Sequence, residues 1–377
     1  MGNVPNLRFP EFSGEWNTER LENLTVSIGD GLHSTPEYCE QGDYCFVNGN
    51  NIIDGKVSIN EKTLRVTKKE AYKHNAALLK ADTILMSING TIGNVALYNG
   101  ENIMLGKSAC YINPSSHIVR EYLFHILSSH RIQAYFQGEL TGTTIKNLSL
   151  KAIRGSKVSI PSNDEQKKIA KLLSLLDERI ATQNKIIEDL KKLKSAIYHK
   201  LFSNLQGEEY SLLELAEITK GQQINGSELS KNGKYYVMNG GVSPSGYYDN
   251  YNTDADTISI SEGGNSCGYV QYNSSEFWSG GHCYTLRIKP ATPILTPFLF
   301  HFLKWKEPDI IALRIGSGLP NIQKKDLGKV CIIVPTLNKQ QRLIALLSSL
   351  QMKIENEEIY AANIDKLKQY LLSQMFI

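Results

Sequence analysis

Apolar residues recur at steps of three and four along two long stretches of the chain. The first stretch runs roughly from Asn163 to Phe202, and its apolar positions are Ile169, Leu172, Leu173, Leu176, Ile180, Ile187, Leu190, Leu193, Ile197 and Leu201. The second runs from Leu343 through Met375, and its positions include Leu346, Leu347, Leu350, Ile354 and Ile364. This period is typical of amphipathic and coiled-coil helices, so each stretch predicts a long helix with one apolar seam.

The first predicted helix has recognisable ends and one interruption of its seam. Ser162 and Glu165 have the spacing of a capping box, and Gly207 follows the end as a stop signal. Gln183 interrupts the seam, and its counterpart in the second stretch is Glu357; a polar seam residue can fix register at some cost in stability.

A helix of about 39 residues is about 58 Å long, which is more than one small domain needs. Each helix has a single apolar stripe, so we expect the two to pair antiparallel and to form a rigid spacer. The alternative is that each helix packs separately on its own globular part.

The globular parts in front of the helices are expected to mix α and β structure. Thr83–Ile88 and Thr257–Ile260 predict strands, and each leads into a glycine-rich turn. Apolar residues at helical spacing predict further helices in the stretches Val119 to Tyr135 and Thr296 to Lys304.

The chain contains an internal repeat. A shift of 174 positions places Asp82-Thr83-Ile84 on Asp256-Thr257-Ile258, because 256 − 82 = 174, and it places Val158–Pro161 on Ile332–Pro335. The resulting division is a first head at residues 1–161, a long helix at 162–206, a second head at 207–335 and a long helix at 336–377. The predicted fold class is α+β: two α/β heads and two antiparallel coiled-coil helices, related by an internal pseudo-twofold.

The composition does not indicate a function, but it argues against a strongly basic protein, a metal site and a membrane segment. A formal net charge of +3 over 377 residues is close to neutral, so any nucleic-acid site must gather its basic groups locally. The six cysteines form no C-x-x-C pair and have no zinc-type histidine cluster near them, which predicts free thiols and no metal site. We see neither a signal peptide nor an apolar run of about 20 residues, so we expect a cytoplasmic protein without a membrane partner.

The duplicated head-plus-helix plan resembles the specificity subunits of bacterial type I restriction-modification systems. The resemblance covers nearly the whole chain. It rests on the glycine-to-proline segments Gly142–Pro161 and Gly316–Pro335, on the predicted strand Asp82–Ser87 with its glycine turn, and on the N-terminal segment Pro5–Pro10. The second copy departs from the pattern because Lys339 stands where the first copy has Glu165, which puts one helix cap in doubt.

The resemblance implies a DNA-reading subunit that has no catalytic centre of its own. Each head would be a target-recognition domain for one half of a bipartite, asymmetric site in double-stranded DNA. The paired helices would set the length of the unread spacer and dock two methyltransferase subunits, and motor-nuclease subunits would complete a complex for phage defence. S-adenosylmethionine, ATP and Mg²⁺ would be bound by those partners, so the chain itself would hold no cofactor.

Motifs that suggest catalysis are weak. Gly106-Lys107-Ser108 resembles the end of a phosphate-binding loop, but Gly100 is one residue too far away. Glu165-Gln166-Lys167 has the spacing of metal-dependent nucleases, although capping explains an acidic residue at a helix start. Asn113-Pro114-Ser115 is the nearest approach to a methyltransferase catalytic turn.

Candidate DNA contacts fall in two groups. Four basic residues of the first head are expected on one helical face, as a strip for phosphate contacts, or equally as an ordinary solvated face: Lys62, Arg65, Lys69 and Lys73. Base reading requires polar side chains on loops. The loop candidates are Asn48, Asn50, Asn51, Asn89, Thr91 and Lys107 in the first head, and Asn239, Tyr247, Tyr248, Asn265 and His282 in the second.

Two other functions remain as alternatives. A stand-alone DNA methyltransferase or nuclease would bind a cofactor or modify DNA without partners. A coiled-coil adaptor with no DNA role would show no salt-dependent affinity for DNA.

Overall fold

The computed structural model describes residues 3–142, 146–316 and 318–377, and these form two compact units. Unit 1 comprises the chain up to Asn184 together with Tyr360–Ile377, and unit 2 comprises Lys185–Ile359. Each unit therefore contains one head and a part of both long helices. Residues 143–145 and 317, within the two repeated glycine runs, lie outside the described residues.

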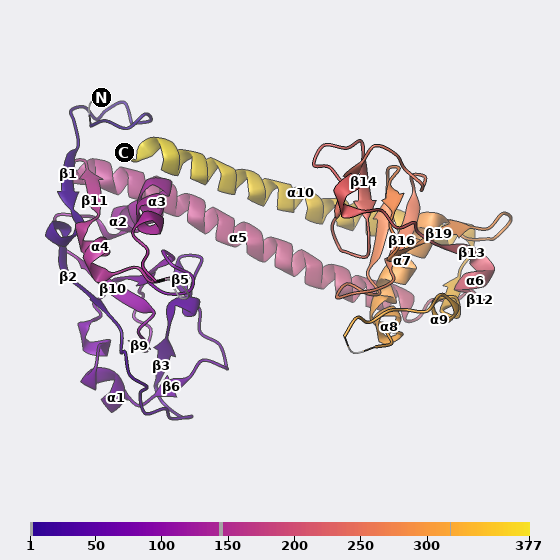
Figure 1. The fold of residues 1–377 in the computed structure, drawn as a ribbon, viewed down its shortest axis with the longest axis horizontal. Coiled ribbons are helices and arrows are strands. Elements are labelled where there is room, and N and C mark those ends of the chain that lie inside the picture. The colour runs from indigo at the N-terminus through magenta and orange to yellow at the C-terminus, as the bar shows by residue number, and fades with distance from the viewer. Residues whose placement is uncertain (1–2, 143–145, 317) are drawn as a thin grey trace. The chain divides into compact units, whose positions relative to one another are not determined.

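The head of unit 1 is built on two sheets that share no strand (Figure 1). The larger sheet has the order β2 (Thr25–Asp30), β10 (Ala109–Pro114), β7 (Ile84–Ser87), β8 (Val95–Leu97). The smaller has the order β6 (Arg65–Val66), β3 (Tyr44–Val47), β9 (Ile103–Leu105), in which β3 and β9 run parallel. The pairs β1 (Asn17–Arg20) with β11 (Lys157–Ile160) and β4 (Ile52–Ile53) with β5 (Lys56–Val57) complete its strands. Its helices are α1 (Lys68–Lys73), α2 (Arg120–Leu127), α3 (His130–Gly138) and α4 (Leu150–Gly155).

The head of unit 2 repeats this topology. Its larger sheet has the order β13 (Ala216–Lys220), β19 (Cys283–Ile288), β16 (Thr257–Ser261), β17 (Val270–Asn273). Its smaller sheet has the order β15 (Gly246–Tyr248), β14 (Tyr235–Met238), β18 (Trp278–Ser279), again with a parallel pair, β14 and β18. The pair β12 (Glu208–Ser211) with β20 (Cys331–Val334) corresponds to β1 with β11. The helices are α6 (Leu212–Leu215), α7 (Thr296–Trp305), α8 (Glu307–Ala312) and α9 (Lys324–Leu327).

The predicted strands are confirmed as β7 and β16, whereas one predicted helix is divided. The stretch from Val119 to Tyr135 forms α2 and α3, which are separated by Ser128 and Ser129. Ser129 has an extended backbone, with φ −67° and ψ 148°, and the Ser128 hydroxyl donates to the Phe124 carbonyl oxygen at 3.0 Å. Local serine hydrogen bonds of this kind compete with helix continuation, so apolar periodicity alone missed the break.

The first long helix has the predicted bounds: α5 spans Asn163–Phe202 (Figure 1). The second, α10, spans Leu337–Met375 and so begins six residues before Leu343, where the apolar pattern placed its start. In unit 1, Lys368 of α10 contacts Asp177 of α5, and Tyr360 lies by Arg179 with 3.2 Å between the tyrosine hydroxyl and the arginine Nη2. In unit 2, Lys191 of α5 pairs with Glu358 of α10 at 2.6 Å, and Lys194 contacts Gln351.

In both units, residues that come later in α5 contact residues that come earlier in α10, so the two helices are antiparallel within each unit. This finding excludes the alternative of two helices that pack separately. The head cores also include both helices: Ile169 and Leu372 lie in one core, and Phe202 and Leu347 lie in the other.

The start of α5 is only partly the predicted capping box. The Glu165 backbone N–H donates to the Ser162 hydroxyl at 3.4 Å, which is the first half of the motif. The Glu165 carboxylate, however, accepts two hydrogen bonds from the Arg8 guanidinium, both at 2.7 Å. Arg8 thus takes the place of the backbone donor that the motif would supply, because a bidentate guanidinium pair is the stronger partner for a buried carboxylate.

Candidate nucleic-acid interface

Three loops of unit 1 meet where β3, β7 and β9 end. The Gly49 backbone N–H donates to the Ser108 hydroxyl at 2.9 Å, and the Ser108 hydroxyl donates to Asn48 Oδ1 at 2.8 Å. The Thr91 hydroxyl donates to the Gly49 carbonyl oxygen at 3.1 Å. The loops 48–51, 89–93 and 106–108 therefore form one surface, which we call the loop cluster of unit 1.

The predicted base-reading residues of the first head all lie in this loop cluster, but their side chains differ in availability. Asn50, Thr91 and Lys107 are exposed, and Asn89 is half-buried. Asn48 and Asn51 instead cap the short 3-10 helix Gly49–Asn51, and Asn51 also donates to the Ser58 carbonyl oxygen. These two asparagines shape the loop, and Asn50, Thr91 and Lys107 are the groups that it presents to solvent.

The corresponding loops of unit 2 also meet. The His282 backbone N–H donates to Asn239 Oδ1 at 3.1 Å, and the Glu262 backbone N–H donates to the His282 carbonyl oxygen at 2.9 Å. The Ser261 hydroxyl donates to the Gly240 carbonyl oxygen at 2.6 Å. Loops 239–241, 262–265 and 280–282 form the loop cluster of unit 2.

Of the predicted residues in the second head, the structure brings Asn239, Asn265 and His282 together and separates two tyrosines from them. His282 and Asn265 are exposed, whereas Asn239 is half-buried. Tyr247 and Tyr248 lie on β15, and Tyr248 is opposite Tyr235 at the start of β14. Asn239 follows the other end of β14, so the tyrosines lie outside the loop cluster.

Each loop cluster contains the same two backbone hydrogen bonds at equivalent positions. In unit 1 the Ile88 N–H donates to the Ser108 carbonyl oxygen and the Leu148 N–H to the Ile88 carbonyl oxygen, both at 2.9 Å. In unit 2 Glu262 and His282 form the first bond, and Ile322 and Glu262 form the second, also at 2.9 Å. The same backbone frame therefore presents different side chains in the two heads.

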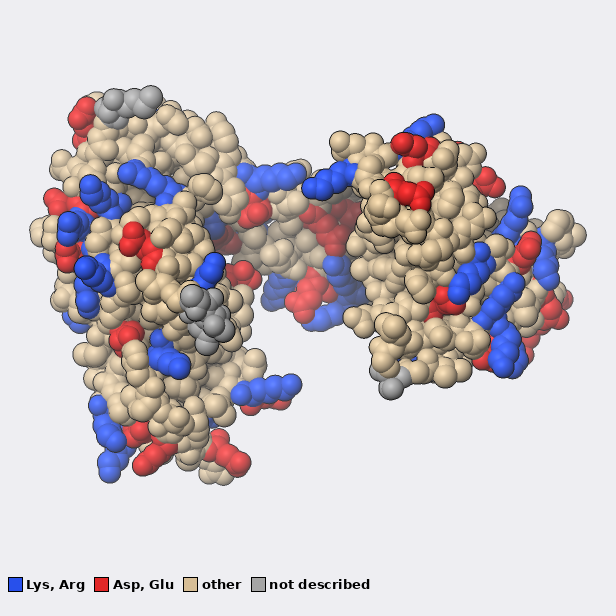
Figure 2. Space-filling model, viewed as in Figure 1, with Lys and Arg blue, Asp and Glu red and all other residues tan. Residues whose placement is uncertain are grey.

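The predicted basic strip of the first head is not one helical face. Lys62 lies in a turn and Arg65 in β6, where strand pairing with β3 holds the backbone extended. Only Lys69 and Lys73 lie in a helix, α1, because the Thr67 side chain caps its start by accepting from the Glu70 N–H. All four side chains remain exposed. On the face seen in Figure 2, acidic and basic side chains are interspersed over each unit.

The predicted helix seam is largely buried. Six members are buried, namely Ile169, Leu173, Ile187, Leu347, Ile354 and Ile364. Five others are half-buried, namely Leu172, Leu176, Ile180, Leu190 and Leu350. Gln183, at the predicted interruption, is buried as well. Leu346 is 49% exposed, so its assignment to the seam was wrong, because the apolar stripe of α10 is wider than the surface that its neighbours cover.

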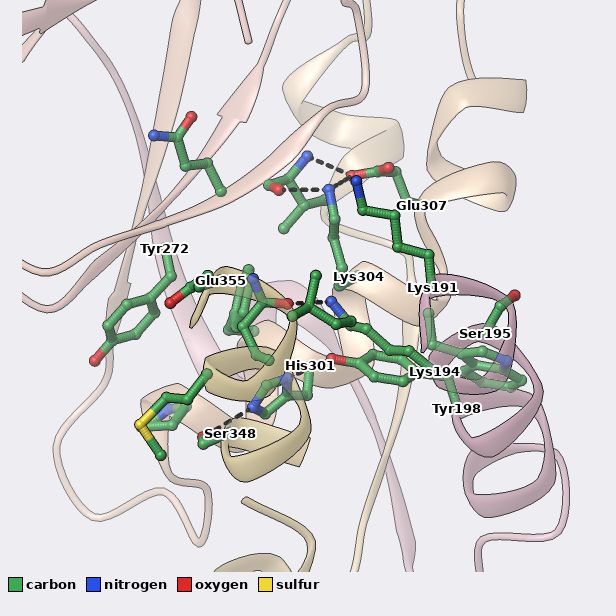
Figure 3. Close-up of a pocket in the computed structure, with 18 of the residues that line it drawn as sticks. Lys191, Lys194, Ser195, Tyr198, Tyr272, His301, Lys304, Glu307, Ser348 and Glu355 are labelled. Carbon is green, nitrogen blue, oxygen red and sulfur yellow. Dashed lines mark hydrogen bonds and ion pairs between the residues drawn. The ribbon is translucent and has the colours of Figure 1, made fainter. Parts of the chain in front are cut away.

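Where the helices join the head of unit 2, a cleft of about 1140 Å³ lies between α5, α7, β17 and α10 (Figure 3). The Tyr198 hydroxyl and His301 Nδ1 are 2.6 Å apart in this region, and Ser348 lies 3.4 Å from the other ring nitrogen. Burial lowers the pKa of His301 to about 4, so the ring is neutral near pH 7. Lys304 donates to Glu307 at 2.6 Å and to the Val270 carbonyl oxygen at 3.0 Å. The cleft's most buried polar groups are thus paired with one another, as in a structural junction.

Unit 1 has an equivalent buried histidine in a different setting. His125 Nε2 lies 3.1 Å from the Ser174 hydroxyl, and its Nδ1 lies 3.8 Å from the Asp177 carboxylate. Burial lowers the pKa of His125 to about 3. Both histidines are therefore neutral core groups, as their place in apolar helical runs indicates.

Two possible properties find no support in the part of the chain that the structure describes. Among residues 3–142, 146–316 and 318–377, no group of three or more His, Cys, Asp or Glu side chains could hold a metal ion. Within the same residues no helix is both long enough and apolar enough to cross a membrane.

The comparisons with known proteins agree on one family. The family described as "Type I restriction modification DNA specificity domain" matches residues 14–192 and again residues 206–364. A Mycoplasma genitalium protein described as a candidate type I specificity subunit is 25% identical over 312 residues, which cover 78% of this chain and 81% of that protein. A Methanocaldococcus jannaschii protein, described as a candidate type I restriction enzyme specificity subunit, is 24% identical and covers 98% of this chain and 95% of its own length.

Solved structures show the same fold. The crystal structure of a type I restriction-modification S subunit from M. genitalium superposes with a TM-score of 0.68 at 22% identity, and 99% of each chain is covered.

The fold and the loop clusters together define a protein with two recognition heads, each joined to a pair of antiparallel helices. Because the family match spans both repeats, the chain belongs to the type I restriction-modification DNA specificity family. It recognises DNA as the specificity subunit of a type I restriction-modification system, and it works as part of that complex. A coiled-coil adaptor without a DNA role is thereby excluded.

Proposed function

We propose that each head reads one half of a bipartite, non-palindromic DNA target through its loop cluster. The observation that carries this proposal is the shared backbone frame with unlike exposed side chains: the loops of unit 1 present Asn50, Thr91 and Lys107, and the loops of unit 2 present Asn265 and His282. Sequence is read by side-chain contacts to base edges, so two heads that differ at these positions read different bases.

The long helices set the length of the unread DNA between the two half-sites. Support comes from the uninterrupted 40 residues of α5 and from its antiparallel pairing with α10 inside each unit. A protein that reads two half-sites on one face of the duplex needs a fixed distance between its readers. A stiff helical pair fixes that distance, whereas a flexible linker does not.

The helices also dock two methyltransferase subunits. On α5 of unit 2, Ile186 and Leu193 are 41% and 51% exposed, and on α10 of unit 1, Tyr360 and Leu367 are 43% and 48% exposed. The repeat shift of 174 places Ile186 on Tyr360 and Leu193 on Leu367. Exposed apolar patches indicate partner surfaces, and a duplicated patch fits two copies of one partner.

Catalysis belongs to the partner subunits in this proposal. Methyltransferase subunits bind S-adenosylmethionine and modify the target, and motor-nuclease subunits bind ATP and Mg²⁺ and cleave DNA, while this chain supplies sequence recognition alone. The complex works in the cytoplasm, where its DNA substrate lies.

Co-expression of this chain with its methyltransferase subunit, followed by sequencing of the modified DNA, tests the proposal. We expect a methylated motif with two unlike halves separated by a fixed number of unspecified bases. A contiguous or palindromic motif would contradict two independent heads. Methylation by the purified chain alone would show instead that the chain is an enzyme.

A further inference from the structure

Glu262 is a carboxylate at the base of the unit 2 loop cluster, and it holds polar groups from three directions. Its Oε1 lies 2.5 Å from Lys220 Nζ, and its Oε2 lies 3.5 Å from His282 Nδ1. The Tyr284 hydroxyl lies 3.4 Å from the same carboxylate and 3.1 Å from the Ile322 carbonyl oxygen, the two acceptors available to its proton. The Glu262 side chain is only 12% exposed, so it acts mainly on these neighbours rather than on solvent.

The sheet fixes this arrangement. Lys220 is the last residue of β13 and lies opposite Tyr284 of β19, while Glu262 directly follows β16, the next strand of the same sheet. The backbone hydrogen bond from Glu262 to His282 joins the two loops, and Asn239 accepts from the His282 N–H. The side chains therefore converge because their backbones are paired.

Lys220 and His282 present their ammonium group and their ring to solvent beside this half-buried anchor, and a protonated His282 ring carries an N–H donor on each nitrogen. Their side chains are 51% and 60% exposed. An ammonium group has three N–H donors, so the bond from Lys220 to Glu262 leaves donors for a ligand. Burial, followed by the nearby Glu262 carboxylate, raises the pKa of Tyr284 to about 12, so its hydroxyl stays protonated and adds no negative charge beside Glu262.

Unit 1 has no such group at the equivalent place. Ile88 corresponds to Glu262 and is buried, and Ser108 corresponds to His282 and donates to Asn48 within its own loops. Asp30 lies opposite Cys110, as Lys220 lies opposite Tyr284, and it pairs with His33 at 2.6 Å. The anchored pair of donors is therefore particular to the second head.

We propose that Lys220 and His282 determine the specificity of the second head by reading a guanine in the major groove, and that Glu262 is the residue that positions them. This inference rests on the proposed function, in which the second head reads one half-site. Guanine presents two acceptors in the major groove, O6 and N7, which suit the Lys220 ammonium group and an N–H donor of the protonated His282 ring. Glu262 offsets one positive charge, so the pair has less attraction for phosphates than two free cations have. The Glu262 carboxylate already accepts a hydrogen bond from Lys220, so it is poorly placed to accept one from the amino group of cytosine.

The test compares Lys220→Ala, His282→Ala and Glu262→Gln with a matched control, Lys329→Ala, in complexes with the methyltransferase subunit. Lys329 belongs to the same unit, is 75% exposed and pairs with Asp326 outside the loop cluster. The affinity of each purified complex is measured for duplexes that carry each base at each position of the wild-type motif. Base preference can then be determined even for variants that bind weakly.

We expect both alanine variants to lose preference at one guanine of one half-site by about ten- to a hundredfold, which is the range for a good base contact. Glu262→Gln keeps the size of the side chain but loses its charge, so it relaxes the same position by a smaller factor. The other half-site stays unchanged in all three variants and reports that the complex is folded. The control leaves the whole motif unchanged.

Lys220→Ala could instead lose affinity equally for all sequences, with a salt dependence reduced by about one phosphate contact. That result would overturn the inference, because it identifies Lys220 as a contact to the DNA backbone. Unchanged preference in the alanine variants would overturn it too. If the wild-type complex gives no split motif, the proposed function itself fails, and that outcome is distinct from the first two.

Discussion

The two heads share their strand order and the hydrogen bonds beneath their loop clusters, but they differ in the side chains that those loops present. In unit 1 the loops present Asn50, Thr91 and Lys107, whereas in unit 2 they present His282, which lies with Lys220 at the end of β13 beside the Glu262 carboxylate. The sheet therefore supplies a constant frame, and a few loop positions determine which bases each head recognises.

The largest effect is expected from a change in length of one helix. Four residues inserted into α5 next to Gln183 lengthen it by about 6 Å and leave α10 unmatched. Because the antiparallel register is then lost on one side of the insertion, we expect methylation of the wild-type motif to be abolished. A second insertion of four residues beside Glu357 restores the match, and sequencing of modified DNA should then show the same half-sites with one or two more bases between them, at about 3.4 Å per base step. New half-site sequences would contradict this account.

The duplicated apolar patches predict the number of partners. Ile186→Ser with Leu193→Ser removes one patch, and Tyr360→Ser with Leu367→Ser removes the other. Each double variant should bind one methyltransferase subunit instead of two, as measured by the mass of the purified complex. Variants that still bind two subunits would show that the partners dock elsewhere.

The ends of the two units differ in one buried ion pair. Arg8 and Glu165 of unit 1 have side chains that are 13% and 1% exposed, whereas Lys339, the unit 2 counterpart of Glu165, is exposed. Arg8→Met leaves the Glu165 carboxylate buried without its partner, so we expect the free energy of unfolding to fall by about 3 kcal/mol. Lys339→Met should change it by less than about 0.5 kcal/mol. Equal effects in chemical denaturation would refute the asymmetry.

The two buried histidines predict a smaller effect that depends on pH. The pKa values of about 3 for His125 and about 4 for His301 lie below that of an exposed imidazole, so the unfolded chain binds protons more readily than the folded chain. Stability is therefore fully present above about pH 6.5 and falls as the pH decreases, by at most about 1.4 kcal/mol per pH unit for each histidine.

His301→Gln should reduce this slope between about pH 6.5 and 4, and His125→Gln should reduce it down to about pH 3. Unfolding in urea across this range measures both slopes. A wild-type slope that neither variant reduces would show that other groups cause the acid sensitivity.

Much of the architecture followed from the sequence because it depends on local patterns. The apolar period of α5 and the polar residues at its start gave its bounds, Asn163–Phe202. The shift of 174 revealed the duplicated heads, and the topologies of the two sheets match it. The break between α2 and α3 was missed because it depends on the hydrogen bonds of two serines rather than on apolar spacing.

The candidate site was harder to predict because its members meet only through tertiary structure. Polar loop residues next to glycine turns were good candidates, and the fold brings most of them into two loop clusters. The sequence could not reveal that Asn48 and Asn51 are occupied with capping, or that Lys62 and Arg65 lie off the helix of Lys69 and Lys73. Lys220 and Glu262 were missed because only the register of β13, β19 and β16 joins them.

Exchange of residues 208–335 for the corresponding head of another family member, followed by sequencing of the methylated DNA, tests the central claim most directly. Independent heads predict that one half of the motif takes the donor's sequence while the other half and the spacing stay the same. A change in both halves, or in neither, would contradict the claim that each head reads its own half-site.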